Sequence, residues 1–162
     1  MTSVLGAQGA SAQTTGSESG RPLPRYVSVG DDEVNVRKGP GTEYPINWVY
    51  LRRGLPVEVI AEYGEWRRVK DLEGRIGWIL VRLLSNSRTL LVRGDGLVDM
   101  HSDARVEAPL IARLEPGVQG KVIQCPRPGS YRSDWCYVEV ADLRGWLPRE
   151  RIWGVYEAEE VK

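Results

Sequence analysis

The chain contains an internal repeat of about sixty to seventy residues, and this repeat constrains its fold more than any other feature. Gly77-Trp78 has a counterpart in Gly145-Trp146. The other matched pairs are Val34 with Val98, Pro45-Ile46 with Pro109-Leu110, Gly54 with Gly117, Val57 with Gly120, Val59 with Val122, Trp66 with Trp135 and Val69 with Val138. A period of this length is too long for a solenoid unit and suits a small domain. The repeat therefore predicts two small domains within the 162 residues.

Short apolar alternations, separated by Gly, Pro, Asn and Asp, predict an all-β protein built from small barrels. Val34 and Val36, for example, alternate with Glu33 and Asn35, as in a half-buried strand. The expected strands lie near 26–29, 33–36, 55–62, 65–70 and 75–79 in the first repeat, and near 89–93, 97–100, 118–125, 134–140 and 144–147 in the second.

A glycine-rich loop follows the second expected strand. Gly39 and Gly41 flank Pro40, so two residues that tolerate positive φ surround one whose φ is fixed. Loops of this kind bind ligands more often than they catalyse reactions. The chain has no Phe but six Trp and seven Tyr, which are rings that can pack on one side and stay hydrated on the other.

These segments resemble the bacterial SH3 domain family. The resemblance rests on NVRKGPGTEYP, RRGLPVEVI, WRRV and GRIGWI, which occur in the family's order over residues 26–85. The second repeat, at about residues 88–156, matches only in its later half, because VDMHSDARVEAP replaces the glycine-rich segment. The resemblance implies two tandem SH3-like barrels, each with a short 3₁₀ turn, near 81–84 and 148–151, before its closing strand.

The resemblance also implies a non-catalytic module of the bacterial cell envelope that binds peptidoglycan or peptides. We expect binding in the first barrel, because only this repeat keeps the glycines and their neighbouring rings. The expected ligand-binding residues are Arg37, Gly39, Gly41, Tyr44, Trp48 and Trp66. Gly77, Trp78, Gly145 and Trp146 are expected to be structural, with the two indole rings packed between strands. Two alternatives stay open: an adaptor that docks a partner envelope protein, and an accessory targeting piece for a separate cell-wall hydrolase.

The predicted domains span residues 25–86 and 87–157, between a disordered segment at 1–24 and a tail at 158–162. Ala10-Ser11-Ala12 follows small apolar residues and fits the end of a secretory signal, although the charged and apolar parts of such a signal are missing. A flexible tail is the alternative. No apolar run has the length of a membrane span.

Cys125 and Cys136, with ten residues between them, stand near the ends of successive expected strands. Folding that hairpin about its midpoint places the two sulfurs opposite each other, which predicts a disulfide. Two reduced thiols are the alternative. Because such bridges persist in oxidising compartments, the pair predicts a periplasmic or secreted protein.

Nothing in the sequence predicts catalysis, a cofactor or a metal site. The single histidine, His101, is expected in a solvated loop, and the chain lacks the paired Cys and His spacings that hold zinc. Acidic clusters such as Asp71 with Glu73 are expected to be solvated turns. Equal numbers of basic and acidic residues, 22 of each, argue against nucleic acid as a partner.

Overall fold

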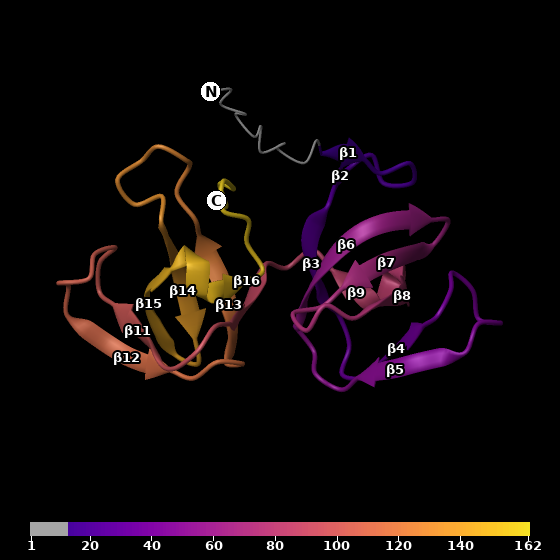
Figure 1. Cartoon of the computed structure of the whole chain (residues 1–162), viewed down its shortest axis with the longest axis horizontal. Helices are drawn as coiled ribbons and strands as arrows, with labels where there is room; N and C mark the ends of the chain where they lie inside the picture. Colours follow the sequence, from indigo (N-terminus) through magenta and orange to yellow (C-terminus); the bar gives the residue numbers. More distant parts are fainter. Residues whose placement is uncertain (1–12) are drawn as a thin grey trace, which may run out of the picture.

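The computed structural model describes residues 13–162, which form two seven-stranded antiparallel sheets and a short N-terminal hairpin (Figure 1). The strand order of the first sheet is β5-β4-β8-β7-β6-β3-β9. Its elements are β3 (Arg25–Val29), β4 (Val34–Arg37), β5 (Ile46–Tyr50), β6 (Pro56–Tyr63), β7 (Trp66–Lys70), β8 (Ile76–Leu80), the 3₁₀ turn η1 (Val81–Leu83) and β9 (Leu84–Ser85).

The second sheet repeats this order as β12-β11-β15-β14-β13-β10-β16. Its elements are β10 (Thr89–Val92), β11 (Val98–His101), β12 (Leu110–Leu114), β13 (Gln119–Gln124), β14 (Trp135–Val140), β15 (Leu143–Pro148), η2 (Arg149–Arg151) and β16 (Ile152–Trp153). Each strand occupies the place of its counterpart in the sequence repeat. The sequence repeat is therefore also a repeat of topology, and the prediction of an all-β chain is confirmed.

Each sheet curls around an apolar core of its own. The first core consists of Val27, Val29, Val34, Val36, Tyr50, Val57, Val59, Val69 and Ile79. The second contains Leu90, Val92, Val98, Met100, Leu114, Val122, Cys125, Cys136, Val138, Val140, Leu147, Ile152, Val155 and Val161. Residues from both edges of a sheet contribute to the same core, so each sheet is strongly curved.

The closed barrels predicted from the sequence are not present. In the described part of the chain, the edge strands β5 and β9 do not pair with each other, and neither do β12 and β16. The reason is the length of the last strand in each sheet. β9 and β16 have two residues each and pair only with β3 and β10, so too little backbone remains to close the ring.

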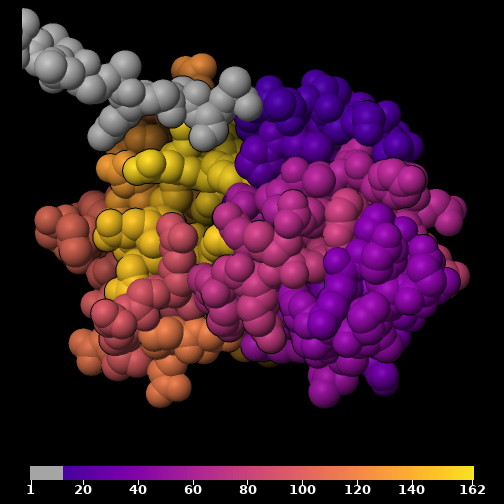
Figure 2. All heavy atoms as spheres, turned by 45° about the vertical axis from the view of Figure 1, so that its right-hand side comes forward, coloured from indigo at the N-terminus to yellow at the C-terminus, as the bar shows by residue number. Residues whose placement is uncertain are grey.

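The N-terminal segment packs against the first sheet, where the sequence predicted disorder for residues 13–24 (Figure 2). β1 (Thr14–Thr15) and β2 (Pro22–Leu23) form a short hairpin. Its turn binds the carboxylate of Glu62 on β6: the backbone N–H groups of Glu18 and Ser19 donate over 2.9 and 3.0 Å, and the Ser19 hydroxyl donates as well. The predicted cleavage pattern at Ala10-Ser11-Ala12 lies outside the described residues.

The Glu62 carboxylate also accepts a hydrogen bond from Arg25 over 2.9 Å. Burial raises the pKa of Glu62, but the hydrogen bonds from Ser19, Glu18 and Arg25 outweigh it and hold the pKa at about 2. The ionised Glu62 carboxylate therefore holds the hairpin turn in place. The polar, glycine-rich composition of residues 13–24 does not predict this contact with β6.

The C-terminal residues, predicted as a tail at 158–162, are packed against the second sheet. Val161 is buried and exchanges two backbone hydrogen bonds of 2.9 Å with Cys125. Arg149, which is 5% exposed, donates to the carbonyl oxygens of Tyr156 and Glu159 over 2.9 and 2.7 Å. These contacts fasten the end of the chain to the second sheet. In the part of the chain that the structure describes, no helix is long and apolar enough to cross a membrane.

The two sheets meet in a seam of aromatic and polar contacts. The Trp153 indole N–H of the second sheet donates to the Pro56 carbonyl of the first over 3.0 Å. The Tyr26 ring packs edge-on against Trp153, with 5.1 Å between the ring centroids. The Tyr156 hydroxyl donates to Glu58 over 2.9 Å, and burial together with the Glu58 charge raises the pKa of Tyr156 well above its ordinary value. These groups are desolvated on both sides, so the seam is a packed junction.

Candidate functional site

The loop after β4 is held from inside by Arg37. The Arg37 guanidinium donates to the carbonyl oxygens of Thr42 and Tyr44 over 3.2 and 2.9 Å. Two backbone hydrogen bonds tighten the same turn, from Gly41 N–H to Gly39 O (3.0 Å) and from Tyr44 N–H to Gly41 O (3.3 Å). Arg37 therefore braces the loop, although the sequence analysis expected it to contact a ligand.

Gly39 is needed for close packing and not for an unusual backbone angle. Neither Gly39 nor Gly41 has a positive φ, although glycine tolerates one. A Cβ atom on Gly39 would lie 2.4 Å from the Tyr44 ring, which covers this residue. Tyr44 itself is 41% exposed. Gly39 and Tyr44 thus form one contact that sets the shape of the loop.

A groove of about 570 Å³ opens between this loop and the start of β7. Its lining consists of Pro40, Gly41, Thr42, Glu43, Glu65, Trp66, Leu80 and Arg82. Trp66 pairs with Leu80 across β7 and β8, which brings Arg82 to the same end of the sheet. Glu43, Glu65 and Arg82 are exposed, and Trp66 is half-buried, so the groove has an aromatic wall and a charged rim. We call it the first groove.

Only two of the six predicted ligand-binding residues, Gly41 and Trp66, line the first groove. Trp48 belongs to a different place. Trp48 is on β5, where it pairs with Val36 of β4, and it packs on the first core. The guanidinium of Arg75 lies 4.9 Å from the centroid of its ring. The position of Trp48 on β5 explains this. Trp48 and the buried Tyr50 are two residues apart, so both side chains lie on the inward face of the strand.

A buried hydrogen-bond network supports Trp48. The Tyr50 hydroxyl donates to the Asp71 carboxylate over 2.9 Å, and Arg75 Nε donates to the same oxygen over 2.9 Å. Asp71 is 4% exposed, so it is not the solvated acid that the sequence suggested. Burial, followed by the Asp71 charge, raises the pKa of Tyr50 well above its ordinary value. The arrangement is structural, since the Tyr50 hydroxyl and Arg75 Nε are both directed at the buried Asp71 carboxylate.

The two Gly-Trp pairs place glycine toward the core and tryptophan on the opposite side. A Cβ atom on Gly77 would lie 2.4 Å from Val36 Cγ1, and one on Gly145 2.6 Å from Met100 Cγ. Since side chains alternate along a strand, Trp78 and Trp146 face outward and belong to neither core. The sequence had instead predicted that both rings pack between strands. Trp78 is half-buried.

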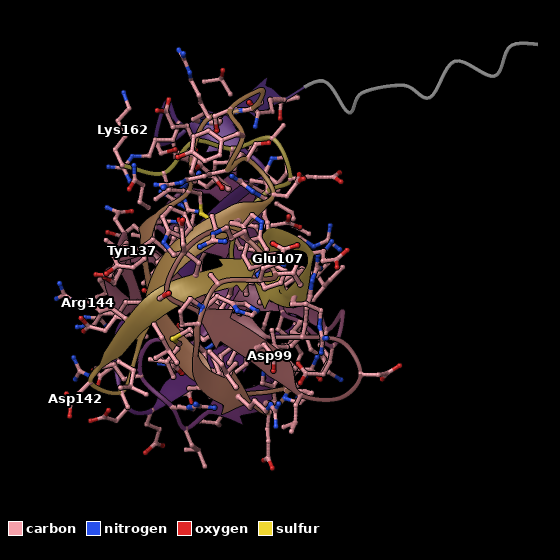
Figure 3. All side chains as sticks on the ribbon, turned by 90° about the vertical axis from the view of Figure 1, so that its left-hand side faces the viewer. Asp99, Glu107, Tyr137, Asp142, Arg144 and Lys162 are labelled. Carbon is pink, nitrogen blue, oxygen red and sulfur yellow. A yellow bond between two sulfur atoms is a disulfide. The ribbon has the colours of Figure 1, made fainter. Side chains whose placement is uncertain are left out.

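Trp146 is 8% exposed because other side chains on the outer face of the second sheet lie against its ring. The Tyr137 ring lies 5.3 Å from it and the Arg132 guanidinium also 5.3 Å. In Figure 3 Tyr137 lies with Arg144 and Asp142 along one side of the second sheet. Burial of Trp146 therefore comes from neighbouring side chains and not from the core.

Both cysteines and the single histidine make structural contacts. Cys125 and Cys136 form the predicted disulfide, with 4.4 Å between their Cα atoms. His101 is 6% exposed, and its Nδ1 donates to the Ala108 carbonyl over 2.9 Å, so it is not the solvated histidine expected from the sequence. Among residues 13–162, no group of three His, Cys, Asp or Glu side chains is arranged to hold a metal ion.

Comparison with known proteins identifies the part of the chain that carries the first groove. Residues 30–86 match the family model of the bacterial SH3 domain. This segment is a bacterial SH3 domain. It runs from the end of β3 to the end of the first sheet, so the bacterial SH3 domain contains the glycine-rich loop, Trp66 and Arg82.

The chain is also similar to the putative N-acetylmuramoyl-L-alanine amidase YrvJ of Bacillus subtilis (strain 168), with 25% identity over 130 residues. The similarity covers 76% of this chain but only 24% of the amidase, so the chain spans about a quarter of that protein.

Two solved structures from Trichomonas vaginalis are similar at low scores. NlpC2 has a TM-score of 0.35 and 9% identity, over 81% of this chain and 48% of that one. NlpC1 has a TM-score of 0.37 and 11% identity, over 94% and 50%.

Proposed function

We propose that this protein is a non-catalytic module of the bacterial cell envelope that binds peptidoglycan or its peptides through the first groove. The proposal takes residues 25–86 and 87–157 as two SH3-like domains, the second divergent. Two findings support it: the bacterial SH3 domain at residues 30–86, and the similarity to a putative N-acetylmuramoyl-L-alanine amidase. N-acetylmuramoyl-L-alanine is the unit that joins glycan to peptide in peptidoglycan.

The observation that carries the proposal is the position of Trp66 beside the exposed loop residues Thr42 and Glu43. The half-buried indole offers a flat apolar face on the wall of the first groove. Exposed Glu43 and Arg82 supply charges of both signs at the rim. A peptide with a free amine and a free carboxylate complements such a groove.

The disulfide supports a periplasmic or secreted location. Cys125 and Cys136 are both fully buried, and bridges of this kind persist in oxidising compartments. An envelope location agrees with peptidoglycan as the ligand, because both are outside the cytoplasm.

An adaptor role is the second candidate, favoured by the edge strand β5. Ile46 and Val49 on this edge are 46% and 37% exposed, and Leu51, just beyond it, is 75% exposed. An unpaired edge with exposed apolar side chains can add a strand from a partner protein. An accessory targeting role for a separate cell-wall hydrolase is compatible with either surface.

Co-sedimentation with purified sacculi tests the proposal. The variant is Trp66→Ala, and its matched control is Tyr63→Ala, which removes an exposed ring outside the first groove. We expect the parent and Tyr63→Ala to sediment with sacculi and Trp66→Ala to lose at least tenfold in affinity, as the removal of a stacking ring predicts. Equal binding by folded Trp66→Ala and parent would refute the first groove as the site.

A further inference from the structure

The second sheet contains a groove at the position equivalent to the first. It has a volume of about 570 Å³ and is called the second groove. Its lining consists of Arg93, Val106, Asp134, Trp135, Pro148, Arg149, Glu150, Val155 and Glu157. Trp135 pairs with Pro148 on the neighbouring strand, as Trp66 pairs with Leu80 in the first sheet. The same pair of strands therefore presents a tryptophan to each groove.

The loop beside the second groove keeps the backbone hydrogen bonds of the first loop without its glycines. Arg105 N–H donates to Asp103 O over 2.9 Å, and Ala108 N–H donates to Arg105 O over 3.2 Å. His101, at the position of Arg37, braces the loop by donating to Ala108 O. The sequence predicted binding only in the first barrel because the second repeat lacks these glycines, but the backbone hydrogen bonds of the loop are retained.

The second groove has an additional wall. In the first sheet two residues join β6 to β7, whereas residues 125–134 join β13 to β14 and form the long loop above these strands in Figure 1. The Cys125–Cys136 disulfide closes this insert. Arg132 ties it to the loop beside the groove through an ion pair with Asp103 of 3.1 Å. The groove is thus framed before any ligand binds.

The aromatic wall of the second groove is also held in place. His101 packs edge-on against Trp135, with 5.8 Å between the ring centroids. Val106, which also lines the groove, is 72% exposed and supplies an apolar surface. A half-buried indole and an exposed aliphatic side chain in one groove suit the methylene stem of an extended side chain.

Three carboxylates and two guanidinium groups line the second groove, so its lining carries one net negative charge. Arg149 is buried and donates to four carbonyl oxygens, those of Ser133, Pro126, Tyr156 and Glu159, over 2.7 to 2.9 Å. By contrast, exposed Asp134, Glu150 and Glu157 form no ion pair among the described residues.

Arg93 is the one exposed cation among the lining residues, and its Nε already donates to the Glu150 carbonyl over 3.0 Å. Three exposed carboxylates therefore face a single partly engaged guanidinium.

We propose that the second groove binds a peptide segment with a free primary amine on an aliphatic stem, such as a lysine-like side chain. The stem lies along Trp135 and Val106, and the ammonium group meets the Trp135 ring and the carboxylates of Asp134 and Glu157. The chain then has two peptide sites, one on each sheet. Bivalency toward sacculi rests on the proposed function, whereas amine binding by the second groove does not.

Titration of the full chain with two capped tripeptides tests the proposal. One is Ala-Lys-Ala and the other carries N-acetyllysine at its centre, so that only the positive charge and its amine differ. Two-dimensional NMR of the indole N–H groups reports which tryptophan responds. We expect the lysine peptide to shift the Trp135 signal and to bind about tenfold more tightly than the acetylated peptide, the size of a desolvated cation–π contact.

Variants assign the site. Trp135→Ala should abolish binding of the lysine peptide. Asp134→Asn with Glu157→Gln, which preserves the shape of the groove and the disulfide, should weaken it about tenfold. Glu115→Gln removes an exposed carboxylate outside the groove and should change nothing. Equal affinities for both peptides, no binding at millimolar concentration, or no effect of the paired acid variant would each overturn the proposal.

The two proposals fail separately. Trp66→Ala should leave binding of the lysine peptide at Trp135 unchanged, because Trp66 lines only the first groove. If sacculus binding depends on Trp66 while the lysine peptide does not bind, the proposed function stands and the second site is refuted. If the lysine peptide binds at Trp135 but sacculi are not bound, the second site stands and the proposed function is refuted.

Discussion

The two sheets have the same strand order and the same loop hydrogen bonds, yet different side chains maintain them. The first loop is braced by Arg37 and shaped by the contact of Tyr44 with Gly39. The second is braced by His101, which donates to Ala108. In both sheets a bulge interrupts the pairing at this point, between Val36 and Arg37 and between Met100 and His101. The comparison shows that the bulge and one side chain that donates a hydrogen bond into the loop are enough to specify its backbone. Glycine is needed only in the first loop, where the Tyr44 ring packs against Gly39.

The sheets differ most in what surrounds this shared frame. The first has an N-terminal hairpin anchored on Glu62, and the second has a disulfide-closed insert and a C-terminal segment anchored by Arg149. These additions lie outside the repeated strands. One architecture therefore supports two surfaces that differ in composition and in what frames them.

Matched truncations in the two cores should have the largest effect. Ile79 on β8 and Leu147 on β15 occupy equivalent positions of the repeat, and both are fully buried. We expect Ile79→Ala and Leu147→Ala each to lower the free energy of unfolding by about 2 to 5 kcal/mol, because each leaves a cavity. Urea denaturation followed by NMR of both sheets measures this. If either variant destabilised both sheets equally, the two cores would form one cooperative unit joined through the seam.

Removal of the disulfide should affect only the second sheet. Cys136→Ser opens the insert, and the chain-entropy estimate for a loop of this size gives a loss of about 3 kcal/mol. We expect a lower melting temperature for the second sheet, with the indole signal of Trp66 unchanged at 25 °C. The parent protein under reducing conditions is the control and should match the variant. Simultaneous melting of both sheets would contradict the assignment of the disulfide to one of them.

The outward-facing tryptophans should differ in importance. Trp146 is 8% exposed under Tyr137 and Arg132, whereas Trp78 is half-buried. We expect Trp146→Ala to lower the free energy of unfolding by about 2 to 3 kcal/mol, and Trp78→Ala by about 1 kcal/mol, in proportion to the apolar area lost. Chemical denaturation of the two variants, monitored by far-ultraviolet circular dichroism, checks this. Equal losses of unfolding free energy in the two variants would show that Trp78 and Trp146 are equally important, which would contradict this prediction.

The smallest expected effect is a pH dependence confined to the N-terminal hairpin. The folded-state pKa of Glu62, about 2, lies below its ordinary value of 4.5. A depressed carboxyl pKa stabilises the folded state fully above pH 4.5, and this contribution is lost as the pH falls toward 2. Hydrogen exchange of residues 14–23 should therefore accelerate between pH 5 and 2 relative to the second sheet, after correction for intrinsic rates.

Glu62→Gln provides the control for this pH effect. The variant should show weakened protection of the hairpin at every pH and no added loss on acidification, since the titrating group is gone. Retention of full protection at pH 2 in the parent would contradict the role of the carboxylate.

The sequence predicted the elements that depend on local pattern. Alternating valines such as Val34 and Val36 placed the strands, the Gly-Trp pairs placed the repeat, and the spacing of Cys125 and Cys136 predicted the bridge. The direction of Trp78 was also available, because Gly77 and Ile79 share the opposite side of the same strand.

The remaining features depend on contacts between distant residues. Leu80 and Arg82 reach the first groove only through the register of β7 and β8, and Glu62 captures the N-terminal turn through three separate donors. His101 is buried because its ring fits between the loop and Trp135. Neither composition nor periodicity contains this information, since each contact joins segments that the sequence separates.

The seam between the sheets has a consequence for polymeric ligands. Trp153, Tyr26 and Tyr156 connect the two units through an indole hydrogen bond, edge-on and tilted ring contacts and a hydroxyl–carboxylate hydrogen bond. The interval between the two grooves is therefore set by packing and not by a flexible tether. A fixed interval favours chains whose attachment points recur at a matching distance, and other spacings leave one groove empty. The protein would then bind most tightly those polymers whose binding units recur at the distance between the two grooves, even among polymers of identical chemistry.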